Sequence, residues 1–163
     1  MPIDVGTEVK DFTVLKATGD KVEPFKLADN IGKESLVLAF FPLAFTGVCT
    51  AEMCTFRDSI AQFGDLKAKV YGVSVDSPFT QNHFIKHEKL NFPLLSDFNR
   101  ELVDAFGVRR TQAIGPAPGL FGVANRSVFV LDKKGKVAYR WFSENPKDLP
   151  PFDEVKAALA KLG

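Results

Sequence analysis

The sequence is poor in cysteine and in polar aromatic residues. It has two cysteines, two tyrosines and one tryptophan, against sixteen phenylalanines. A chain of 163 residues can bury roughly 70% of the surface that its unfolded form exposes, so it needs no disulfide for stability. We therefore expect one domain over residues 1–163, and two cysteines that serve catalysis or metal binding.

An excess of charge of one sign is also missing. The 21 basic and 20 acidic residues leave a net charge of +1, so we expect neither nucleic acid nor an anionic membrane as a partner. The longest apolar run, SLVLAFFPLAF at residues 35–45, is too short to span a bilayer. The N-terminus lacks a basic stretch, an apolar core and a cleavage site. We therefore predict no signal peptide and a cytoplasmic location.

The apolar pattern changes period several times along the chain. Alternating or continuous apolar stretches predict strands, namely a hairpin turning at residues 18–20, strands at 35–43, 69–76 and 92–97, and a hairpin at 126–142. Apolar residues three and four apart predict helices, namely 50–66, 78–90, 99–107 and 150–163. This order predicts a mixed sheet with helices on both faces, which is a thioredoxin-like α/β fold with an added N-terminal hairpin.

Residues 108–125 contain closely spaced glycines and prolines and are predicted to form a long loop. A loop of this length usually shapes a site or an interface. Its apolar residues Ile114, Leu120 and Phe121 could line the entrance to a site, form a dimer contact or anchor the loop to the core.

Cys49 lies between the predicted strand 35–43 and the helix that follows it. The free N–H groups and the positive end of a helix dipole favour a thiolate over a thiol. Thr46 can offer a hydroxyl toward the same space, and Pro42 stiffens the approach and shields the sulfur from water. We therefore expect Cys49 to be a reactive thiolate at the carboxyl end of a central strand.

The motif Pro42-x-x-x-Thr46-x-x-Cys49 resembles the signature of the peroxiredoxins. Glu52 and Arg126, which opens the stretch RSVFVLD, also match that family. The similarity extends over nearly the whole chain and is strongest to the branch of bacterioferritin comigratory protein and alkyl hydroperoxide reductase E.

The resemblance implies a thiol-dependent peroxidase in which Cys49 attacks a hydroperoxide and becomes a sulfenic acid. Thr46, the Cys49 N–H and Arg126 would hydrogen-bond the peroxide oxygens, and Arg126 would also stabilise the thiolate. Glu52 would position Arg126, or it would only complement the helix N-terminus. Sulfur is the redox centre, so no metal, flavin or haem is required. A thioredoxin- or glutaredoxin-like protein would supply electrons, and a homodimer is possible.

Cys54 either resolves the oxidised Cys49 or takes no part in catalysis, and the sequence leaves both interpretations open. Positions i and i+5 of an α-helix are roughly 8–9 Å apart at Cα, whereas a disulfide needs about 4.4–6.8 Å. A bond between Cys49 and Cys54 therefore requires the first helical turn to unwind. The resemblance implies that Cys54 is the resolving cysteine. The alternative is a one-cysteine enzyme that is resolved by an external thiol.

Three other classes of protein compete with a turnover peroxidase. Cys49 and Cys54 with His83 and His87 make a formal zinc set, but their spacing is far from that of a zinc finger. A redox carrier of the thioredoxin type would need a Cys-x-x-Cys motif, which is missing. A peroxide sensor would share the first chemical step but would be oxidised once and would not turn over.

Overall fold

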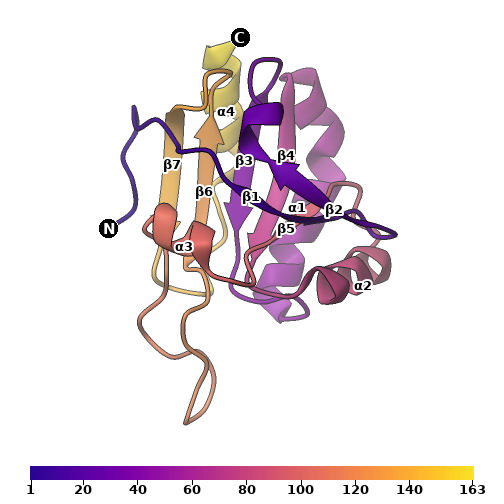
Figure 1. Ribbon diagram of the computed structural model, residues 1–163, viewed down its shortest axis with the longest axis vertical. Helices are drawn as coiled ribbons and strands as arrows, with labels where there is room; N and C mark the ends of the chain where they lie inside the picture. Colours follow the sequence, from indigo (N-terminus) through magenta and orange to yellow (C-terminus); the bar gives the residue numbers. More distant parts are fainter.

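The computed structural model describes residues 1–163 as a central sheet flanked by helices (Figure 1). The sheet has seven strands in the order β2-β1-β5-β4-β3-β6-β7. The strands are β1 Thr13–Ala17, β2 Val22–Lys26, β3 Ser35–Phe40, β4 Ala68–Ser74, β5 Leu94–Ser96, β6 Arg126–Leu131 and β7 Val137–Ser143. The helices are α1 Gly47–Asp65, α2 Pro78–Glu88, α3 Glu101–Ala105 and α4 Phe152–Leu162, with a short 3-10 turn at Leu27–Asp29.

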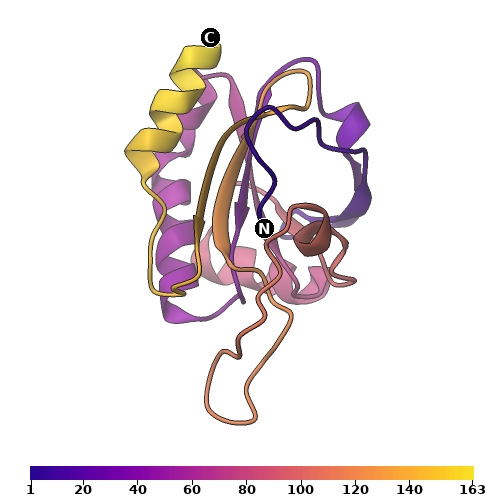
Figure 2. The same ribbon diagram turned by 90° about the vertical axis from the view of Figure 1, so that its left-hand side faces the viewer.

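Helices cover both faces of the sheet, but unequally (Figure 2). Buried side chains from α1, α2 and α4 share one apolar core with the sheet. The second core, on the opposite face, contains residues of α3 and of the N-terminal hairpin β1–β2. The predicted mixed sheet, with its N-terminal hairpin and its helices on two faces, is therefore confirmed.

The strand β3 lies in the interior of the sheet, between β4 and β6, and leads directly to the cysteines. It pairs in parallel with β4 and antiparallel with β6, and all six of its residues are buried. This explains its continuous apolar sequence, because both of its faces are covered. The chain then crosses residues 41–46 and enters α1 at Gly47, three positions before the predicted helix start.

Gly72 in β4 allows α1 to lie close to the sheet. A Cβ atom at this position would come within 2.5 Å of the Leu94 Cδ2 atom and 3.0 Å of the Met53 Sδ atom. Such distances are below van der Waals contact, so a larger residue would push α1 away from β4. The absence of a side chain at Gly72 therefore helps to set the depth at which the cysteine-bearing helix sits.

The predicted long loop is present and forms a hairpin-like extension. Isolated bridges pair Arg109 with Ala124 and Ile114 with Leu120. The loop projects beyond the end of the sheet at which β3 ends and β6 begins (Figure 1). Ile114 packs against the second core, whereas Leu120 and Phe121 are 54% and 58% exposed. Of these three apolar residues, only Ile114 therefore packs against the core. No helix of this fold combines the length and the apolar character that crossing a bilayer would require.

Candidate active site

Cys49 and Arg126 are brought together by the pairing of β3 with β6. Phe40, the last residue of β3, is opposite Ser127 in the register. Arg126 is therefore level with the point where the chain leaves β3 and turns toward α1. Cys49 lies in the first turn of α1, so two residues 77 positions apart face the same buried space.

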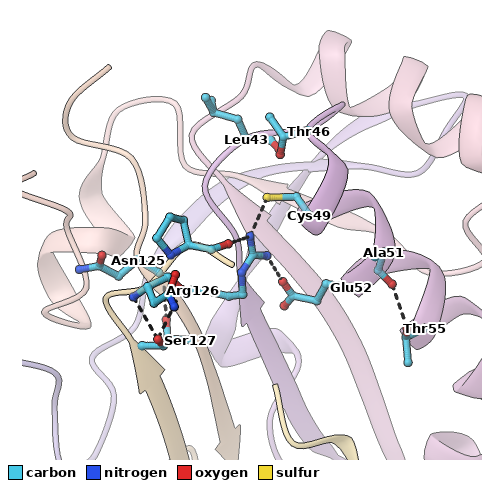
Figure 3. Close-up of polar contacts among 12 residues, drawn as sticks. Leu43, Thr46, Cys49, Ala51, Glu52, Thr55, Asn125, Arg126 and Ser127 are labelled. Carbon is cyan, nitrogen blue, oxygen red and sulfur yellow. Dashed lines mark hydrogen bonds and ion pairs between the residues drawn. The ribbon is translucent and has the colours of Figure 1, made fainter. Parts of the chain in front are cut away.

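The guanidinium group of Arg126 joins the three residues of this space (Figure 3). Its Nη2 atom donates a hydrogen bond to the Cys49 sulfur at 3.2 Å, and its Nη1 atom donates to the carboxylate of Glu52. Nη2 also donates to the backbone carbonyl of Pro146 at 2.8 Å. Cys49 and Arg126 are each 1% exposed and Glu52 is fully buried. The predicted site residues Cys49, Glu52 and Arg126 are thus in contact.

The cluster places a buried positive charge beside the Cys49 sulfur. A fixed positive charge within hydrogen-bonding distance stabilises a thiolate more than a thiol, and the effect is larger where water is excluded. Glu52 is one helical turn from Cys49, but burial raises its pKa from 4.5 to about 7, against the opposing effect of Arg126. Near neutral pH, Glu52 is therefore only partly ionised, and its carboxylate neutralises the positive charge of Arg126 only in part.

Thr46 precedes α1 as its N-cap residue, and Pro42 is buried upstream of it. The Thr46 side chain makes no capping hydrogen bond. Its hydroxyl donates instead to the carbonyl of Leu43 at 2.8 Å (Figure 3), and the residue is exposed. The N–H groups of the first turn are consequently left without a side-chain acceptor. The oxygen of Thr46 can still accept a hydrogen bond through its lone pairs. The hydroxyl lies at the surface of the turn, near Cys49 (Figure 3).

Asp76 holds the turn before α1 and was not identified from the sequence. Its Oδ2 atom accepts a hydrogen bond from the N–H of Ala44 at 2.8 Å and another from the Ser74 hydroxyl at 2.7 Å. Asp76 follows β4, which is the strand next to β3. A carboxylate at the carboxyl end of a neighbouring parallel strand is a signal that could have found it.

The turn after β7 was also missed as part of the site. The carbonyl of Pro146 accepts from Arg126, and the nearby Glu144 carbonyl accepts from Nη1 of Arg110. Arg110 is almost fully buried and also donates to the Asn125 side chain at 3.1 Å. Two arginines therefore hold this turn against the start of β6. Nothing in the local sequence of residues 144–146 predicts this role, because it depends on backbone carbonyls.

Cys54 lies in α1 five residues after Cys49, and both thiols are free. Its sulfur is 3.6 Å from the Oε2 atom of Glu88 in α2. Burial raises the pKa of Cys54; Arg57 opposes this rise, and the hydrogen bond and the charge of Glu88 add to it. The two cysteines thus share a helix but have partners of opposite charge.

The histidines of the formal zinc set do not join the cysteines. His83 and His87 lie on α2, where each ring packs beside the exposed ring of Phe45 at centroid distances of 6.0 Å and 5.7 Å. Phe45 has a positive φ of 66°, a backbone conformation that is uncommon for a residue of this size. No group of three or more His, Cys, Asp or Glu side chains is placed to hold a metal ion.

The chain is similar to known proteins over most of its length. Residues 5–140 match the model of the AhpC/TSA family. Peroxiredoxin Bcp of Bacillus subtilis is 36% identical over 148 residues, covering 91% of this chain and 90% of that protein. The crystal structure of peroxidoxin BcpB from Mycobacterium tuberculosis superposes with a TM-score of 0.79 at 33% identity, covering 98% and 96% of the two chains.

Other relatives are much longer than this chain. The chloroplastic 2-Cys peroxiredoxin BAS1 of Spinacia oleracea is 33% identical over 142 residues, which are 83% of this chain but only 51% of that protein. The chain thus spans about half the length of that relative. The family model, the Bcp relative and the BcpB structure together confirm the resemblance read from the signature. The chain belongs to the AhpC/TSA family and is a peroxiredoxin, similar to those of the Bcp branch.

Proposed function

We propose that this protein is a thiol-dependent peroxidase with Cys49 as its peroxidatic cysteine. The observation that carries the proposal is the buried contact of the Cys49 sulfur with Arg126, which Glu52 and the Pro146 carbonyl hold in place. A buried cation beside a cysteine at a helix N-terminus stabilises the thiolate, which is the nucleophilic form of the side chain.

The first step follows from this arrangement. The Cys49 thiolate attacks the terminal oxygen of a hydroperoxide, so that an S–O bond forms, the O–O bond breaks and the alkoxide or hydroxide takes up a proton. Arg126 and the Cys49 N–H are the donors proposed to stabilise the charge that develops on the leaving oxygen. The Thr46 hydroxyl, which donates its own hydrogen to Leu43, is proposed to accept a hydrogen bond from the O–H of the bound peroxide. Pro42 keeps water from the sulfur, and Glu52 orients Arg126.

Cys54 is proposed to resolve the sulfenic acid by forming a disulfide with Cys49. Both cysteines are on α1, and the spacing of i and i+5 separates their Cα atoms by roughly 8–9 Å in a regular helix. The first turns of α1 must therefore unwind before the bond forms. A small dithiol protein of the thioredoxin or glutaredoxin type would then reduce the disulfide.

Several broader features belong to the same proposal. The substrates would include hydrogen peroxide and organic hydroperoxides. The protein would act in the cytoplasm as one domain over residues 1–163, with no nucleic acid or membrane as a partner. A homodimer is part of the proposal because the loop of residues 108–125 exposes the apolar side chains of Leu120 and Phe121.

Intact-mass spectrometry after one equivalent of hydrogen peroxide tests the proposal. We expect the loss of two hydrogen atoms, which marks a Cys49–Cys54 disulfide, and dimedone labelling of Cys49 in a Cys54→Ser variant. A gain of one oxygen without a disulfide would support the one-cysteine alternative. Labelling of any other residue would contradict the assignment of Cys49.

Turnover separates an enzyme from a sensor. With excess dithiothreitol and peroxide, we expect many equivalents of peroxide to be consumed per protein molecule. Consumption that stops after one equivalent would contradict a turnover peroxidase and would favour a sensor.

A further inference from the structure

Cys54 and Glu88 face each other where α1 packs beside the end of α2. The Cys54 thiol donates to Oε2 of Glu88 at 3.6 Å, and the other carboxylate oxygen, Oε1, is 3.0 Å from Nδ1 of His87. The Glu88 side chain is only 22% exposed, whereas His87 is 64% exposed. Both oxygens of a largely sheltered carboxylate are thus occupied, and one of them is occupied by the thiol proposed to resolve the sulfenic acid.

Two further hydrogen bonds fix the same part of α1 to the end of α2. Nη1 of Arg57 donates to the backbone carbonyl of Glu88 at 2.6 Å. The side chain of Asn91 donates to the backbone carbonyl of Arg57 at 3.2 Å. Together with the thiol contact, these bonds hold the turn of α1 that runs from Cys54 to Arg57.

Burial is the main factor that favours the protonated form of Cys54, and Glu88 adds to it. A thiol that donates to a carboxylate would, as a thiolate, face a like charge at hydrogen-bonding distance. Asp58 and Glu88 both disfavour the thiolate, and among the charged groups near this sulfur Arg57 favours it. His87 contacts the carboxylate rather than the thiol.

We propose that Glu88 is the positioning residue of the resolving step: it holds Cys54 as a hydrogen-bonded, unreactive thiol while α1 is intact, and it releases Cys54 when the helix unwinds. This inference rests on the proposed function, because it assumes that Cys54 resolves Cys49. On this proposal, Glu88 ensures that Cys49 reacts with peroxide before Cys54 does, because it keeps Cys54 protonated.

The chemical balance of the resolving step needs no further reactant. After release, the Cys54 thiol loses its proton and its sulfur attacks the sulfur of the Cys49 sulfenic acid. The S–S bond forms, the S–O bond breaks, and the departing hydroxide takes up the proton to give water. The peroxide has already supplied the oxidising equivalent. While the Glu88 contact persists, the thiolate that performs this attack is suppressed.

The thiol of Cys54 can be titrated by itself in a Cys49→Ser background. The rate of alkylation by iodoacetamide is measured from pH 6 to 11 with and without Glu88→Gln, which preserves shape but removes the charge. In Glu88→Gln we expect the midpoint of the pH profile of the alkylation rate to move to lower pH, so that alkylation at pH 8 becomes about threefold to tenfold faster. Glu88→Asp, which keeps the charge on a shorter side chain, should fall between the two.

Two controls separate this effect from loosening of the fold. Increased access of water to Cys54 would raise the rate reached at high pH as well as lower the midpoint, because burial itself raises the pKa of this thiol, whereas loss of the Glu88 charge alone should lower the midpoint and leave the high-pH rate unchanged. Glu23→Gln removes a glutamate of β2 that pairs with Lys16 and should leave the whole profile unchanged. A midpoint that does not move in Glu88→Gln overturns the proposal.

The disulfide itself gives the second measurement. In the chain with both cysteines, rapid quenching after one equivalent of peroxide should show that Glu88→Gln forms the Cys49–Cys54 bond about twofold to fivefold faster, because more thiolate is present and one helix contact is lost. Slower formation would overturn the proposal, because it would make Glu88 a group that assists the attack.

Failure of the proposed function has a different signature. If dimedone never labels Cys49, the peroxidase proposal fails, whereas the midpoint in the Cys49→Ser background still reports whether Glu88 holds the thiol of Cys54. If Cys49 is labelled and the parent forms no disulfide, the peroxidase stands and the role of Glu88 in resolution is overturned.

Discussion

The two cysteines of this protein occupy one helix but two different environments. Cys49 is 1% exposed and its sulfur accepts a hydrogen bond from Arg126 at 3.2 Å. Cys54 is half-buried and its sulfur donates toward the carboxylate of Glu88 at 3.6 Å. A cation therefore faces the first sulfur and an anion faces the second.

This difference shows how a fold can give two identical side chains different chemistry. The intrinsic acidity of the two thiols is the same, so only their surroundings can separate them. Arg126 comes from a neighbouring strand and Glu88 from a neighbouring helix. The difference in the charged group that contacts each sulfur is therefore a property of tertiary packing.

The strongest way to break the comparison is to remove each sulfur in turn. Cys49→Ser should reduce peroxide consumption by about a thousandfold or more, because the nucleophile is lost. Cys54→Ser should leave the reaction with the first equivalent of peroxide unchanged. Stopped-flow measurement of peroxide loss tests both variants, and equal rates for Cys49→Ser and the parent would refute the assignment.

Removal of the cation should have the next largest effect. We expect Arg126→Gln to slow the reaction of Cys49 with peroxide about 100-fold, because a charged donor to the reacting atoms is lost. Arg109→Gln is a matched control, since that arginine pairs with Asp104 at the surface. Circular dichroism should confirm that both variants are folded. A rate within threefold of the parent would contradict a role for Arg126 in the chemistry.

Glu52, which contacts the cation beside Cys49, should make the stability of the protein depend on pH. Its pKa is about 7 in the fold against 4.5 ordinarily, chiefly because it is buried. Between these two values the folded protein binds more protons at Glu52 than the unfolded chain does, so this group makes the free energy of unfolding fall as pH rises from 4.5 to about 7. The contribution is at most about 3 kcal/mol.

Glu52→Gln should remove this slope. Urea unfolding at pH 5 and pH 8 is the measurement, and the variant should gain stability relative to the parent at pH 8. If the difference between variant and parent is the same at both pH values, Glu52 does not titrate in this range.

Substitution of Arg57 should give the smallest effect. It should change the pKa of Cys54 in the direction opposite to substitution of Glu88. The charge of Arg57 opposes the rise in the pKa of Cys54. Arg57→Gln should therefore slow the alkylation of Cys54 at pH 8 about twofold, measured in the Cys49→Ser background. Faster alkylation with a shifted midpoint would contradict the sign of the electrostatic argument.

Much of the fold and part of the site could be predicted from local patterns. The continuous apolar run beginning at Ser35 correctly indicated a central strand, since burial on both faces leaves no polar positions. The start of α1 was placed at Thr50 instead of Gly47, because apolar periodicity carries no signal in a first turn that contains few buried residues. Thr46 was expected to offer a hydroxyl toward the space around Cys49; the local motif did not predict the hydrogen bond that this hydroxyl donates to Leu43.

Contacts between distant residues were not predictable in this way. Asp76 is 32 positions from Ala44, and Glu88 is 34 positions from Cys54. Each is an ordinary acidic residue in its own stretch of sequence. Its role arises only because parallel strands end together or because α1 meets the C-terminal end of α2.

The amino-acid sequence by itself determined the order of strands and helices and the peroxiredoxin signature around Cys49, because both are written in residue type and local spacing. Only the tertiary structure decided which charge faces each sulfur and which backbone carbonyls hold Arg126. Those choices depend on the register between β3 and β6 and on the packing of α1 against α2. Electrostatic interactions act over a few ångströms through space, and no pattern along the chain records that distance.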